Sequence, residues 1–86
     1  MKYTQHTLDK LEEVLTELEY VVRYERGTFQ SGYCILEQRK VVVLNKFLQL
    51  EGRINTLADI IPRLVVNAEL LSPEARKTLN MIHAKA

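Results

Sequence analysis

Apolar residues recur at every third or fourth position along three stretches of the chain, which is the spacing of one face of an α-helix. This pattern predicts helices over about His6–Tyr20, Gln49–Ile61 and Pro73–His83. The third helix begins at Ser72-Pro73-Glu74, where serine can cap it, proline fits its first turn and glutamate meets its positive end. Pro62 has no backbone N–H and its ring clashes with the preceding turn, so we expect the second helix to end or kink there.

Between the first two helices the period changes to two, which is typical of β-strands. It predicts strands over Tyr20–Arg26, Tyr33–Glu37 and Lys40–Leu44. The last of these is apolar on both faces, so we expect it to be the central or best-covered strand. A tight polar break at Gln38–Arg39 and a glycine-bounded loop, Gly27–Gly32, indicate two hairpins in series. The expected sheet is a three-stranded antiparallel meander in the order 1-2-3.

We expect the first two helices to bury one face of this sheet. The opposite face is predicted to carry Tyr33 and Ile35 together with Val41 and Val43, and so apolar a surface needs a cover. Either the third helix or a second copy of the chain can supply it; the third helix can also close an edge of the sheet or reach a partner. The segment 63–67, which contains Leu-Val-Val, fits either a fourth short strand or an extended connector.

The length and composition are those of one folded domain. The chain has 86 residues, of which 47% are hydrophobic and 27% charged, so we expect a single domain over residues 1–86 rather than disorder. The fold class is predicted to be α+β, with the meander packed against two to three helices. The net charge of +1 produces no overall attraction to nucleic acid or to a membrane.

The expected location is the cytoplasm. One cysteine allows no internal disulfide, which fits a reducing compartment. The chain shows neither a basic-then-apolar leader nor an apolar stretch of about 20 residues, the length that spans a bilayer. We therefore expect no membrane partner.

The titratable side chains form no catalytic set in the sequence. Cys34 is the only thiol and lies in the middle of a strand, whereas His6 and His83 lie near the two termini. A nucleophilic cysteine needs a nearby base, so a buried core cysteine is the preferred interpretation. No pair of these residues has the spacing of zinc ligands. We expect no catalytic residue, no metal, no cofactor and no enzymatic activity.

Basic and aromatic residues gather near the predicted strands, and the set comprises Arg23, Arg26, Lys46, Tyr24, Tyr33 and Phe47. Such sets bind single-stranded nucleic acid by stacking and charge. In the alternative interpretation the rings pack in the core and the arginines are solvated. The near-zero net charge and the lack of an RNA-binding signature favour this alternative, so nucleic acid is not the expected partner.

The loop Gly27–Gly32 displays Phe29 and Gln30, which are unusual residues for the tip of a turn. Phe29 fits either a contact with a partner or a ring that folds back onto the core. The candidate binding residues are therefore Arg23, Arg26, Phe29, Gln30 and Lys46.

The run NKFLQLEGRINTLADII, which begins at Asn45, resembles the strand-to-helix segment of the small bacterial zinc peptidases that cleave phage-type repressors. The matching positions are Asn45, Leu48, Glu51, Thr56, Leu57 and Ala58. In that family the next residues are His-Glu-x-x-His, whose histidines bind zinc and whose glutamate is the catalytic base. Here Asp59, Ile60 and Arg63 occupy those three positions. The resemblance therefore implies a similar local fold in a non-catalytic relative.

The longer run RGTFQSGYCILEQRKVVVLNKF, with EGRIN after it, resembles a group of short bacterial proteins that carry no assigned activity. Three hypotheses follow for the function. The first is a cytoplasmic, non-enzymatic interaction or regulatory module that contacts another protein or forms a homodimer. The second is a small-ligand or nucleic-acid binding domain that uses the basic-aromatic surface. The third is a degenerate, non-catalytic peptidase-like domain.

Overall fold

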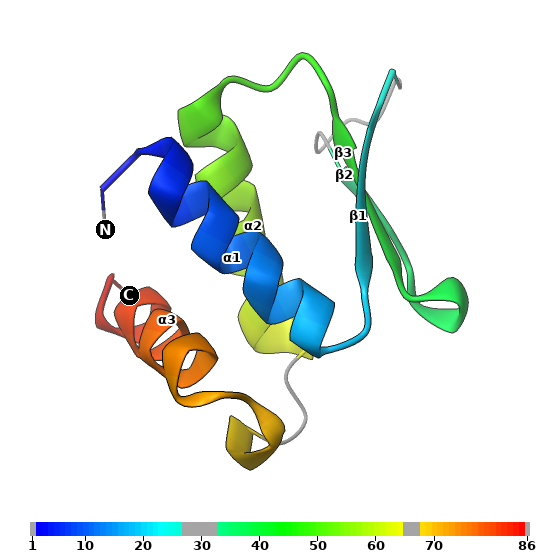
Figure 1. The fold of residues 1–86 in the computed structure, drawn as a ribbon. Helices are drawn as coiled ribbons and strands as arrows, with labels where there is room; N and C mark the ends of the chain where they lie inside the picture. The colour runs from blue at the N-terminus through cyan, green and yellow to red at the C-terminus, as the bar shows by residue number, and fades with distance from the viewer. Residues whose placement is uncertain (1, 27–32, 65–67, 86) are drawn as a thin grey trace.

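The computed structural model describes residues 2–26, 33–64 and 68–85, and Figure 1 shows how the elements follow one another. The helices and strands are α1 (Gln5–Glu17), β1 (Val21–Glu25), β2 (Tyr33–Leu36), β3 (Val41–Asn45), α2 (Leu50–Leu64) and α3 (Pro73–Lys85). Two short 3₁₀ helices, η1 (Glu37–Arg39) and η2 (Ala68–Leu70), join neighbouring elements. The predicted α+β fold class is confirmed. None of the helices within these ranges is long and apolar enough to cross a membrane.

The strand order of the sheet differs from the prediction. The order is β1-β3-β2, with β1 parallel to β3 and β2 antiparallel to it, so the antiparallel meander in the order 1-2-3 is wrong. The prediction that the Lys40–Leu44 segment is the central or best-covered strand is confirmed, because β3 pairs with a strand on each side. Placing the most apolar strand in the centre removes both of its backbone edges from water, whereas the order 1-2-3 leaves one of them open.

Only one of the two predicted hairpins forms. β2 and β3 are joined through η1 and pair in antiparallel register, with Leu36 opposite Val41. β1 and β2 are not neighbours in the sheet, so the first predicted hairpin is wrong. The loop Gly27–Gly32 that connects them lies outside the described residues.

The register shows which side chains share a face of the sheet. Ile35 lies opposite Val42, and both contribute to the core on the helical side, so the expected place of Ile35 on the uncovered face is wrong. Tyr33 was expected on the uncovered face together with Ile35. Its backbone pairs in register with Leu44, which is a core residue.

The uncovered face of the sheet is still apolar, as predicted, although its members differ. Val41 and Val43 share it with Val21 and Leu36. The exposed fractions of Val21 and Leu36 are 55% and 43%, whereas Val43 is buried, with 7% exposed.

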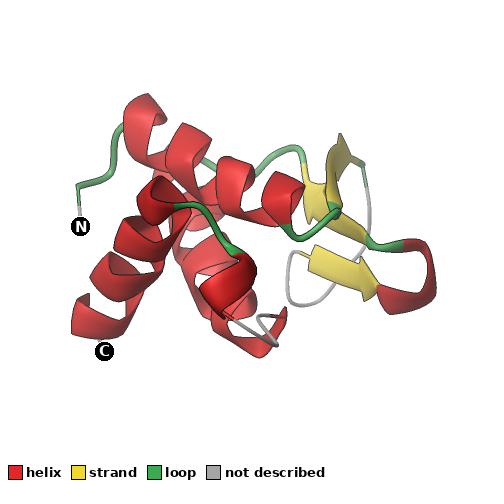
Figure 2. Cartoon of the chain, turned by 60° about the horizontal axis from the view of Figure 1, so that its bottom comes forward, coloured by secondary structure: helices red, strands yellow, loops and turns green. Residues whose placement is uncertain are grey.

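The three α-helices all lie on the other side of the sheet (Figure 2). The alternatives in which the third helix covers the outer face or closes an edge of the sheet are therefore wrong. α3 packs instead on α1 and α2 through apolar side chains, among them Ala75, Leu79 and Ile82, and Met81 is exposed. A second copy of the chain on the outer face stays a prediction.

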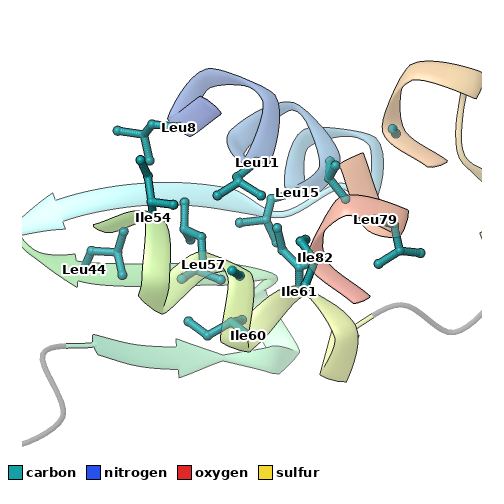
Figure 3. Close-up of a cluster of buried hydrophobic side chains, with 14 of the residues drawn as sticks. Leu8, Leu11, Leu15, Leu44, Ile54, Leu57, Ile60, Ile61, Leu79 and Ile82 are labelled. Atoms are coloured by element: carbon teal, nitrogen blue, oxygen red, sulfur yellow. The ribbon is translucent and has the colours of Figure 1, made fainter. Parts of the chain in front are cut away.

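The core lies between the sheet and the helices and continues between the helices themselves (Figure 3). Leu44 from β3, Leu11 and Leu15 from α1, and Ile54 and Leu57 from α2 all have no exposed surface. The buried positions on α1 and α2 follow the three-to-four spacing of apolar residues in the sequence, so the helical faces were predicted correctly. The parallel β1–β3 pair closes over the same core through Val22 and Tyr24.

Side-chain hydrogen bonds join α3 to the end of α1. The carboxylate of Glu17 accepts hydrogen bonds from the backbone N–H and the hydroxyl of Ser72, each at 2.7 Å. The Ser72 hydroxyl oxygen also accepts a bond from the N–H of Ala75, so its predicted role as the helix cap is confirmed. The two bonds from Ser72 lower the pKa of Glu17 below its ordinary value, because they favour the charged carboxylate.

α2 does not end at Pro62. The helix continues to Leu64, so Arg63 and Leu64 are helical and the predicted strand or connector over 63–67 is wrong for these two residues. Residues 65–67 lie outside the described part of the chain. Proline at this position deprives only the carbonyl of Ala58 of its helical donor, while burial of Ile60 and Ile61 against the core favours the helical path.

Candidate binding surface

The parallel pairing of β1 and β3 brings their carboxyl ends together, since Glu25 lies opposite Asn45. Arg26 follows directly after β1, and Lys46 and Phe47 follow directly after β3. The guanidinium carbon of Arg26 lies 5.8 Å from the centroid of the Phe47 ring, and Lys46 Nζ lies 5.5 Å from it. We call Arg26, Lys46 and Phe47 the Phe47 cluster.

Phe47 is exposed because two hydrogen bonds to Asn45 fix the turn that follows β3. The side-chain Oδ1 of Asn45 accepts a hydrogen bond from the N–H of Phe47 at 3.0 Å, and its carbonyl accepts one from the N–H of Leu48. The side chain of Leu48 packs against the core. The adjacent Phe47 ring is 67% exposed, which is unusual for a side chain whose burial is so favourable.

Arg53, near the start of α2, forms hydrogen bonds with the backbone of the turn that follows β3. Its Nε donates to the carbonyl of Leu48 at 2.9 Å and its Nη2 donates to the carbonyl of Lys46 at 3.0 Å. Its guanidinium carbon also lies 4.6 Å from the centroid of the Tyr24 ring on β1. One side chain therefore joins β1, the turn and α2, and the planar fork of arginine suits it for bonding two carbonyls together.

The ring beneath Arg53 is held in turn by α1. The hydroxyl of Tyr24 donates to the carboxylate of Glu12 at 2.9 Å. Burial, together with the hydrogen bond and the negative charge of Glu12, raises the pKa of Tyr24 well above its ordinary value. The raised pKa keeps the Tyr24 hydroxyl protonated, and it donates its hydrogen bond to Glu12.

The cations of the Phe47 cluster have no acidic partner among the residues that the structure describes. Within those ranges the ion pairs join Arg23 to Glu25, Lys40 to Glu19, and Arg63 to Asp59. Arg26 and Lys46 are both exposed and make no such pair. Two positive charges without a described acidic partner therefore lie beside Phe47 although the chain is nearly neutral.

The predicted binding residues separate in the structure. Arg26 and Lys46 meet at the Phe47 cluster, whereas Arg23 lies on the outer face of the sheet and pairs with Glu25 at 3.5 Å. Phe29 and Gln30 lie outside the described residues. Arg53 could not be recognised from the sequence, because its role depends on the unpredicted pairing of β1 with β3.

A groove of about 460 Å³ opens between α2 and α3, beside the residues that the peptidase resemblance aligns with a metal site. Its lining includes Asn55, Ala58, Asp59, Pro62, Ile82 and His83. Asp59 forms an ion pair with Arg63 at 3.7 Å, while Ile60 is fully buried in the core. Of these three side chains only Asp59 can bind a metal ion, and Ile60, at the position of the catalytic glutamate, cannot act as a base.

The remaining candidates for chemistry do not come together. His83 lies on the exposed side of α3, and His6 is exposed near the start of α1. The described residues contain no group of three histidine, cysteine or acidic side chains that could hold a metal ion. The side chain of Cys34, on β2, is not described, so its place in the core stays a prediction.

The function of this chain is inferred from the geometry of its structure, because comparisons with known proteins found no match. No family model, no curated protein and no solved structure matches the chain. Both resemblances noted in the sequence therefore stay predictions. Two surfaces are candidates for binding a partner, namely the Phe47 cluster and the groove beside Asp59.

Proposed function

We propose that this chain is a cytoplasmic, non-enzymatic interaction module and that the Phe47 cluster is the surface with which it contacts an anionic partner. The observation that carries the proposal is an exposed aromatic ring with two cations beside it, neither of them paired with a described acidic residue.

The energetics of the cluster favour contact with a partner. Burying a phenylalanine side chain contributes about 2–3 kcal/mol, which the free protein forgoes at this position. The guanidinium of Arg26 and the ammonium of Lys46 can form charge-assisted hydrogen bonds with anionic groups. Because the net charge is only +1, such binding depends on these local charges and not on the field of the whole molecule.

Reversing the two charges of the cluster is expected to abolish binding to a polyanion. The unmodified protein should be retained on a heparin column at low salt, and the double variant Arg26→Glu/Lys46→Glu should elute in the void volume. Two like charges that face a polyanion are converted from attractive to repulsive, and salt weakens the remaining contacts. The measurement is the salt concentration at elution.

The matched control is Arg76→Glu/Lys77→Glu, which makes the same change in net charge on the exposed face of α3. In Figure 1, α3 lies on the far side of the helical layer from the strands. This control should stay bound almost as tightly as the unmodified protein. Equal losses in both double variants would show that net charge alone governs retention, and no retention of the unmodified protein would refute the proposal.

The groove beside Asp59 supports a second candidate, a peptidase-like domain that binds polypeptide without cutting it. The supporting observation is that α2 packs beneath the central strand while the groove opens where the resemblance places an active site. Adding an unstructured peptide without net charge to ¹⁵N-labelled protein should then shift the amide signals of Asn55, Asp59 and His83 and leave those of Lys46 and Phe47 in place. Unchanged groove signals at millimolar peptide would remove this candidate.

A further inference from the structure

We propose that the partner of the Phe47 cluster is single-stranded nucleic acid, with one base stacked between the Phe47 ring and the Arg26 guanidinium and the adjoining phosphates on Lys46. This inference rests on the proposed function, because it names the class of anionic partner that the same surface takes. The inference applies to single-stranded nucleic acid, whose bases are unpaired, and not to a duplex.

The spacing within the cluster suits an inserted base. The 5.8 Å between the Arg26 guanidinium carbon and the Phe47 centroid is too long for direct stacking and slightly too short for a planar group between them. Two stacked layers at about 3.5 Å each need roughly 7 Å. Both side chains are exposed, so a small rotation of Arg26 opens this gap. Aromatic rings and guanidinium planes are the groups on which proteins stack unpaired bases.

The fixed turn keeps the ring available for stacking. The N–H of Phe47 is bonded to Asn45, and Arg53 bonds the carbonyls on both sides of it, those of Lys46 and Leu48. The backbone that carries the ring is therefore ordered before the ligand arrives, which lowers the entropy cost of binding. A carboxylate-rich peptide can pair with the same cations, but its acidic side chains leave the Phe47 ring in water.

The small footprint sets the expected strength of binding. One stacked base and two cations should give a dissociation constant on the order of 0.1 mM for a ten-nucleotide oligothymidylate at low salt, typical of binding without sequence preference. The logarithm of the affinity should fall with the logarithm of salt concentration with a slope of about −0.7, since Lys46 neutralises one phosphate and each neutralised phosphate contributes about −0.7 for single strands. Lys46→Ala should bring the slope close to zero.

Fluorescence anisotropy with labelled oligothymidylate tests the stacking contact. Phe47→Ala should weaken binding about 10-fold, because one base–aromatic stack is lost, whereas Phe47→Tyr should bind as the unmodified protein does. Arg26→Lys keeps the charge but removes the planar group, so it should weaken binding several-fold. Inorganic polyphosphate, which has charge but no bases, should bind all of these variants equally.

The outcomes separate this inference from the proposed function. If Phe47→Ala and Arg26→Lys bind the oligonucleotide as tightly as the unmodified protein, the stacked base is refuted while retention on heparin still supports an anionic contact. If a deca-glutamate peptide binds more tightly than the oligonucleotide and depends on Phe47, the partner is an acidic protein and the inference is wrong. If neither heparin nor any of these probes binds, both proposals fail.

Discussion

Replacing Leu57 by alanine is expected to lower the free energy of unfolding by about 3 kcal/mol, a large share of the total for a domain of this size. Leu57 has no exposed surface and lies in the middle of α2, between the side chains of α1 and those of the sheet (Figure 3). Truncation removes the transfer free energy of its branched end and leaves a cavity that neighbours on three elements cannot all close. Urea denaturation followed by circular dichroism measures the change.

Leu70→Ala is the matched control for this prediction. It makes the same chemical change at a side chain that is 82% exposed, on the short helix η2, so the free energy of unfolding should change by less than about 0.5 kcal/mol. Similar losses in the two variants would contradict the placement of Leu57 at the centre of the core. The same comparison tests whether α2 packs on the sheet at all.

The periodicity of the sequence predicted the helices and the identity of the central strand, because local burial determines both. The residues Leu11, Leu15, Ile54 and Leu57 recur at helical spacing and are all buried. The order of the strands could not be obtained in this way, since it depends on which edges pair. The apolar character of Val41–Leu44 on both faces predicted its central place, and that place is incompatible with the sequential order assumed for the meander.

The Phe47 cluster was predicted only in part, for the same reason. Arg26 and Lys46 are 20 residues apart in the chain. In the expected antiparallel meander the carboxyl ends of β1 and β3 lie at the same end of the sheet, but β2 separates them. Direct parallel pairing makes these two ends neighbours, with Glu25 opposite Asn45. Arg53 contacts both the Tyr24 ring and the turn after β3. Its role as a positioning residue therefore depends on the pairing of β1 with β3.

The continuation of α2 beyond Pro62 shows a tertiary effect that overrides a local preference. Proline is disfavoured in a helix because it removes one hydrogen bond and crowds the preceding turn. Near this point in α2, Ile61 is fully buried and Leu64 is partly buried and packed against the core. Their burial favours continuation of the helix by more than the proline disfavours it. The chain therefore retains a local conflict that a single substitution can remove.

Replacing Pro62 by alanine is accordingly expected to raise the free energy of unfolding by about 1–2 kcal/mol. Alanine is about 3 kcal/mol more favourable than proline in a helix interior, and it supplies an N–H to the carbonyl of Ala58. Part of this gain is offset because the unfolded chain becomes more flexible and because Pro62 lies near the end of α2. Urea denaturation again measures the change.

Pro73→Ala is the matched control for Pro62→Ala, because Pro73 is the first residue of α3, where no N–H is needed and the fixed backbone angle suits the helix. The same substitution should therefore lower the free energy of unfolding there, by about 0.5 kcal/mol. Opposite signs at the two prolines would show that the strain belongs to the position in the helix and not to the residue type. A loss of stability in both variants would mean that packing of the Pro62 ring beside Ile82 and His83 outweighs the missing hydrogen bond.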